Sequence, residues 1–75
     1  MLMFQIKIST GDADKVRVYH FSHKQCDTVS IEQQKEDFDK AVKQINHIYK
    51  DYGRFATSVG VLRLFDKFGF ERTVP

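Results

Sequence analysis

The strongest pattern in this 75-residue chain is one amphipathic helix, predicted to run from Ser30 to Tyr52. It begins with SIEQ, a capping-box sequence that has Ser30 at the N-cap and Gln33 three residues later. Gly53 follows the last periodic residue, as a glycine that ends a helix does. A helix with one apolar stripe has to bury it against another layer. The stripe covers an arc of about 120° and consists of Ile31, Phe38, Ala41, Val42, Ile45, Ile48, Tyr49 and Tyr52.

The segments on either side of this helix carry strand patterns. Residues 2–9 alternate between apolar and polar side chains, and residues 15–21 are rich in β-branched and aromatic types, so we expect a hairpin that turns at residues 10–14. Residues 55–65 are predicted as a third strand. The sequence DKFG at 66–69 is typical of a turn and predicts a fourth strand over residues 70–74.

These elements predict an α+β fold of order ββαββ, in which one long helix packs on one face of a four-stranded, mainly antiparallel sheet. Residues 1–75 form one domain, because a chain of this length has no room for a second core. The order of the strands within the sheet stays open. A single cysteine excludes an internal disulfide and fits a reducing compartment, so we expect a cytoplasmic protein. No stretch is long and apolar enough for a membrane span, so no membrane contact is expected.

One helix covers only one face of the sheet, so the other face is predicted to be open. We expect Leu62 and Leu64 to face the helix, because the opposite orientation would bury the charges of Arg63 and Arg72. The open face then becomes rich in aromatic and arginine side chains, which are enriched at the centres of protein interfaces. The residues predicted to bind a partner are Arg17, Tyr19, Phe21, Arg63, Phe65, Phe70 and Arg72. A second copy of the chain, or the chain's own ends, are the alternative covers for this face.

A cluster of histidine and cysteine raises the question of metal binding or catalysis. His20, His23, Cys26 and Asp27 follow one another closely, and His47 lies on the helix. Zinc sites normally show two paired spacings, and this cluster is irregular. A catalytic cysteine also needs an orienting group and oxyanion donors, which nothing in the sequence marks. We therefore predict no metal, no cofactor and no enzymatic activity, with these residues in a connecting loop.

The same predicted face suggests single-stranded nucleic acid as an alternative partner. Exposed rings stack on bases, and arginines neutralise phosphates. A secondary basic patch of Lys43, His47, Lys50 and Arg54 lies at the C-terminal end of the helix. A net charge of +2 is small for a protein that binds a polyanion.

The sequence therefore predicts a small, non-enzymatic module that masks the surface of a partner protein or complex. By analogy of size alone, such a chain resembles accessory or inhibitory proteins, including phage inhibitors of host enzymes or defence complexes. Self-association is an alternative. The sequence does not identify the partner or the source.

Overall fold

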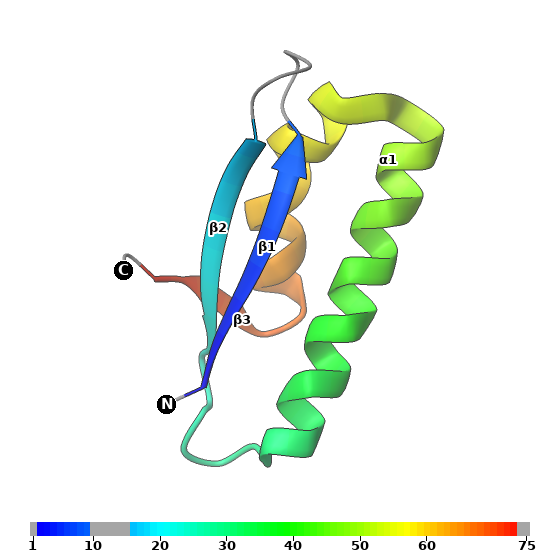
Figure 1. Ribbon diagram of the computed structural model, residues 1–75. Coiled ribbons are helices and arrows are strands. Elements are labelled where there is room, and N and C mark those ends of the chain that lie inside the picture. The colour runs from blue at the N-terminus through cyan, green and yellow to red at the C-terminus, as the bar shows by residue number, and fades with distance from the viewer. Residues whose placement is uncertain (1, 10–15, 74–75) are drawn as a thin grey trace.

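The computed structural model describes residues 2–9 and 16–73 and contains two long strands, a bent helix and a short third strand (Figure 1). The elements are β1 (Met3–Ser9), β2 (Val16–His23), α1 (Ile31–Lys67) and β3 (Phe70–Arg72). The three strands form one antiparallel sheet in the order β1-β2-β3, so β2 is central and β1 and β3 are edges. The predicted turn at residues 10–14 lies outside the described residues.

α1 is bent at Gly53, where φ is +87° and ψ is −174°. We call residues 31–52 the first half of α1 and residues 54–67 the second half. Both halves pack on the same face of the sheet, since Phe38 of the first half stacks on Phe4 of β1 and Phe65 of the second half stacks on Phe21 of β2. The α+β class is confirmed, with the order β-β-α-α-β.

The prediction of a third strand over residues 55–65 is wrong, because these residues belong to the second half of α1. A helix brings residues four apart to one side. Thr57, Val61 and Phe65 follow this spacing and are buried, whereas Leu62, which was expected to face the helix, is exposed. The predicted four-stranded sheet is therefore reduced to three strands among the described residues.

The ends of the helical halves agree with the local sequence signals. The Ser30 hydroxyl accepts a hydrogen bond from the backbone N–H of Gln33 at 3.1 Å, which confirms the N-cap. The Gln33 side chain donates to the Asp37 carboxylate instead of returning to Ser30, so the capping box is half formed. After Lys67 the chain turns through Gly69, whose φ of +94° is the left-handed value expected for that glycine.

The apolar stripe of the first half is buried only in its middle. Ala41 and Ile45 are buried, whereas Ile31 and Tyr52 at the two ends are exposed. The prediction that Tyr52 faces the core is therefore wrong. The helix is longer than the sheet that it covers, so its terminal turns have no strand beneath them.

The strand register decides which side chains face the helix. Ile6 lies opposite Tyr19 and Phe4 lies opposite Phe21, and directly opposite residues of antiparallel strands share a face. The expected inward face of β1 is confirmed, with Ile8 buried and Phe4 and Ile6 packed against the core. The core consists of Ile8, Tyr19, Phe21, Ala41, Ile45, Val61, Phe65 and Phe70.

Candidate binding site at the sheet edge

The aromatic residues predicted to form an open binding face are inside the protein. Tyr19, Phe21, Phe65 and Phe70 are each at most 2% exposed. Phe65 stacks on Phe21 with ring centroids 4.4 Å apart. The predicted exposure of the four rings is wrong, because the second half of α1, which carries Phe65, covers the face of the sheet that carries Tyr19, Phe21 and Phe70. The prediction of an open face assumes a single helix, and the structure has two helical halves on one face.

The three predicted arginines are exposed but do not form one surface with these rings. Arg17 lies near the start of β2, Arg63 lies on the second half of α1, and Arg72 lies on β3. The Arg72 guanidinium carbon is 5.3 Å from the centroid of the Tyr19 ring, a cation–π contact at the rim of the core. Partner contacts by these arginines stay a prediction.

The secondary basic patch is also exposed where it is described. Lys43, His47 and Lys50 follow one another at helical spacing on the first half of α1. Lys43 lies 3.2 Å from Asp39, an ordinary i,i+4 ion pair. The side chain of Arg54 lies outside the described part of the chain, so the patch as a whole stays a prediction.

The histidines and the cysteine point in different directions. His23 is buried on the helix-covered face, whereas His20 lies on the opposite face. The Gln25 N–H donates to His23 Nδ1 at 3.1 Å, so the hydrogen of the neutral ring lies on Nε2, 3.3 Å from Asp37 Oδ2. The Cys26 thiol lies 3.9 Å from the Asp27 carboxylate. Across residues 2–9 and 16–73, no three His, Cys, Asp or Glu side chains gather where they could hold a metal ion.

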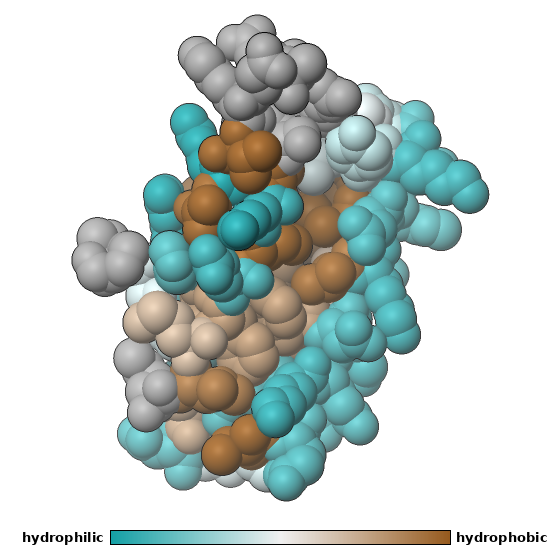
Figure 2. All heavy atoms as spheres, in the orientation of Figure 1, coloured by the Kyte–Doolittle hydropathy of each residue, from teal (hydrophilic) through white to brown (hydrophobic). Residues whose placement is uncertain are grey.

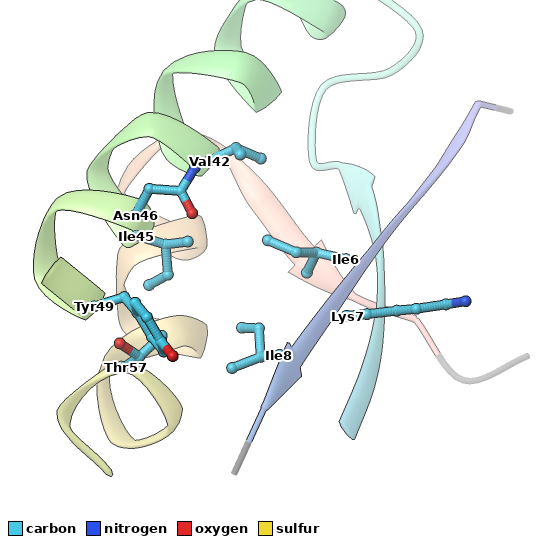
Figure 3. A pocket seen from close by; sticks show the side chains of 8 residues that line it. All are labelled: Ile6, Lys7, Ile8, Val42, Ile45, Asn46, Tyr49 and Thr57. Carbon is cyan, nitrogen blue, oxygen red and sulfur yellow. The ribbon is translucent and has the colours of Figure 1, made fainter. Parts of the chain in front are cut away.

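One of the hollows of the described fold is a groove between β1 and α1, which we call the β1 groove. It encloses about 360 Å³. Figure 3 shows Ile6 and Ile8 facing Ile45 and Tyr49 across the gap, while Lys7 points away from it. In Figure 2 apolar side chains gather in a band between the strands and the polar outer surface of α1. The groove is lined by Ile6, Lys7, Ile8, Val42, Ile45, Asn46, Tyr49 and Thr57.

The groove exists because the helical layer is wider than the sheet. Two packed helices cover about 20 Å, since helix axes lie about 8–10 Å apart. Strands lie about 4.8 Å apart, so a layer of two helices matches about four strands, and this sheet has three. The second half of α1 lies over β2, and the first half lies over β1 and extends beyond its edge (Figure 1). The first half therefore presents apolar side chains to a space that a fourth strand would fill.

Sequence reasoning missed this groove, because each of its apolar residues was correctly assigned to the side of its element that faces the other layer. The signal for the groove is the mismatch between the numbers of helices and strands, which becomes visible only when residues 55–65 are recognised as helical.

No protein-family model matches this chain, and comparisons with curated proteins and with solved structures found no match. Among the described residues, no helical stretch combines the length and apolarity that crossing a lipid bilayer requires.

Proposed function

We propose that this chain is a small, non-enzymatic binding module that holds part of another protein in the β1 groove. The observation that carries the proposal is the apolar groove itself, open to solvent beside an edge strand. Ligand sites are typically concave, mostly apolar and equipped with a few polar groups. Here Asn46, Thr57 and the Tyr49 hydroxyl are the polar groups among the aliphatic side chains, and Lys7 points away from the groove (Figure 3).

The groove replaces the sheet face as the proposed contact surface. The rings predicted to anchor a partner are buried in the core. The apolar surface of the groove is open on the described part of the chain, so an added molecule would remove it from water. Burial of apolar surface contributes roughly 25 cal/mol per Å². An occupant with apolar side chains would therefore gain binding energy there without displacing any part of the fold.

A non-catalytic role is supported by the hydrogen bonds of His23, a candidate base for Cys26. Both ring nitrogens of His23 are engaged by Gln25 and Asp37, so this ring does not face Cys26 as a base. The mode of action that we propose is masking, in which the module occupies a segment that its partner needs elsewhere. Inhibition of a host enzyme or defence complex by a phage protein is an example of such action. A cytoplasmic location belongs to the same proposal and rests on the single cysteine.

Site-specific photocrosslinking tests the proposal. A photoreactive residue at Asn46, which lines the groove, is compared with one at Gln44, which is also exposed on α1 but does not line it. We expect a protein adduct from position 46 and none from position 44. An excess of this protein without the photoreactive residue should compete for the partner and reduce the adduct. An excess of Asn46→Trp, in which the larger side chain fills the groove, should not reduce it.

The other outcomes of the same experiment each contradict the proposal. An adduct that is sensitive to nuclease would support the nucleic-acid alternative, and an adduct of twice the chain's mass would support self-association. Equal labelling from positions 44 and 46, or no labelling from either, would show that the groove has no specific occupant.

A further inference from the structure

We propose that the occupant of the β1 groove is an extended segment of a partner protein, which adds to β1 as a fourth strand of the sheet. This inference rests on the proposed function and specifies its partner class. Three observations lead to it: the direction of the backbone groups of β1, the mismatch between two helical halves and three strands, and the position of Lys7 (Figure 3).

The hydrogen bonds to β3 establish which backbone groups of β2 face which neighbour. The Lys24 N–H donates to the Gly69 carbonyl at 2.8 Å, and the Thr73 N–H donates to the His20 carbonyl at 2.8 Å. In an antiparallel pair, alternate residues of a strand direct both backbone groups to the same neighbour. The even-numbered residues of β2 therefore face β3, and the odd-numbered residues face β1.

The same alternation continues into β1. Tyr19 is odd-numbered and faces β1, where its register partner is Ile6. The N–H and C=O groups of Ile6 are thus used within the sheet, and those of its neighbours Gln5 and Lys7 point out from the free edge. Across the described residues, no other element donates to or accepts from the backbone of these two residues. Unpaired groups in such a row are a template for another strand.

The side chains of an added strand would also fill the apolar space of the groove. Successive side chains of a strand point to opposite faces, so every second side chain of the occupant would enter the groove beside Ile6, Ile8 and Val42. The remaining side chains would lie on the open face beside Lys7, which points away from the groove (Figure 3). We therefore expect an occupant that alternates aliphatic residues with polar ones and carries an acidic residue next to Lys7.

Neither a helix nor a second copy fits this space as well. A helix is about 10–12 Å wide and offers no free backbone groups to the edge, whereas the layer mismatch leaves the width of about one strand. A β1 strand from a second copy would bring its own α1, whose first half also extends beyond its β1. With the two β1 strands about 4.8 Å apart, the two helices would compete for one position.

Amide hydrogen exchange, with a synthetic peptide as probe, tests the inference. The probe is an acetylated and amidated seven-residue peptide that alternates valine with threonine and one central glutamate. In the protein alone, we expect the amides of Phe4 and Ile6 to exchange slowly and those of Gln5 and Lys7 to exchange rapidly. Adding the peptide should slow exchange at Gln5 and Lys7 at least tenfold. Slow exchange at these two amides without peptide, or no slowing with it, would overturn the inference.

The peptide itself provides the matched control. N-methylation of the amides on one edge of the peptide removes donors toward β1, whereas N-methylation of the alternate amides leaves those donors intact. We expect the first modification to weaken binding at least tenfold and the second to change it less than threefold. Equal effects of the two modifications would contradict strand addition.

Protein variants give an independent check. Gln5→Pro removes an N–H that points out of the sheet, whereas Gln5→Ala removes only the side chain on the open face. We expect the proline variant to bind the peptide at least tenfold more weakly and the alanine variant to bind within twofold. If Gln5→Pro unfolds the protein, the binding of the two N-methylated peptides to the natural chain still tests strand addition.

The two proposals can fail separately. If Asn46 crosslinks to a protein but the two N-methylated peptides bind equally, the groove is a binding site for a non-strand partner, and only the strand inference fails. If Asn46 forms no specific adduct, the proposed function fails as well.

Discussion

The two halves of α1 differ in where their inward apolar side chains lie relative to the sheet. In the second half, Val61 and Phe65 are 0% exposed and belong to the core, whereas Val59 and Leu62 are exposed. In the first half, Ala41 and Ile45 are buried to a similar degree, but Val42 and Tyr49 line an open groove. The first half has the clearer helical pattern in the sequence, and the second half has the fully buried aromatic ring, Phe65.

This difference separates two roles within one element. The second half fills the space over the centre of the sheet and contributes the Phe65 ring to the aromatic core. The first half is longer than needed to cover β1, and its excess apolar surface forms one wall of the β1 groove. A strong amphipathic pattern therefore identifies a helix without showing how much of its stripe the protein itself covers.

The largest expected effect comes from the core of the second half. Phe65→Ala should lower the free energy of unfolding by about 3–5 kcal/mol, because it removes a fully buried ring that stacks on Phe21. Leu62→Ala, three residues earlier in the same helix, should cost about 0.5 kcal/mol or less, because Leu62 is exposed. Urea denaturation monitored by circular dichroism measures both. The reverse order would indicate the strand that the sequence predicted, with Leu62 inside.

Replacing a glycine by alanine should have opposite effects on stability at the junction between the halves and in the interior of the second half. Gly53 has a φ of +87°, so Gly53→Ala should destabilise the protein by about 1–3 kcal/mol. Gly60 has no atom within 4 Å of an added Cβ and no positive φ, so Gly60→Ala should stabilise it by about 0.5–1 kcal/mol. Thermal unfolding of the two variants gives the signs directly. Destabilisation by both would mean that residue 60 is not inside a helix.

The start of the first half should show a smaller loss. Ser30→Ala removes the hydroxyl that accepts from the Gln33 N–H and should cost about 1 kcal/mol. Ser30→Asp should restore most of this stability, because a carboxylate also accepts at the N-cap and suits the helix dipole. The urea midpoints of unfolding of the natural chain and of the two Ser30 variants measure these differences. An alanine variant as stable as the natural chain would show that packing alone holds this end of the helix.

The smallest effect is expected at the surface ion pair between Lys24 and Asp66, which joins the loop after β2 to the end of the second half. Both side chains are well exposed, so Asp66→Asn should change the free energy of unfolding by about 0.5 kcal/mol or less. Addition of salt should reduce the difference further. A loss above about 1 kcal/mol, measured in the same urea assay, would mean that this pair anchors the second half.

Local signals in the sequence predicted a substantial part of the fold. The alternation of residues 2–9 predicted β1 and its inward face, and the sequence from Ser30 to Gly53 predicted the first half of α1 with both of its ends. These features depend on periodicity, capping and a positive φ, which neighbouring residues specify.

The candidate site could not be predicted in the same way. Residues 55–65 contain β-branched and aromatic residues, which favour a strand, and Gly60, which disfavours the interior of a helix. Their burial pattern of Thr57, Val61 and Phe65 also satisfies a helix, and the sequence alone did not decide between the two. With that segment misassigned, Tyr19 and Phe21 were placed on the wrong face and the groove was invisible.

The sequence by itself determined the elements whose hydrogen bonds are local, namely the first half of α1 with its N-cap and the glycine at its end, and the alternating strands β1 and β2. Only the tertiary structure decided the state of the second half and which face of β2 lies inside. Both depend on contacts between residues far apart in the chain, such as Phe21 with Phe65. The β1 groove is a consequence of these contacts. The helical layer has two halves where the sequence predicted one helix, and the sheet has three strands where the sequence predicted four.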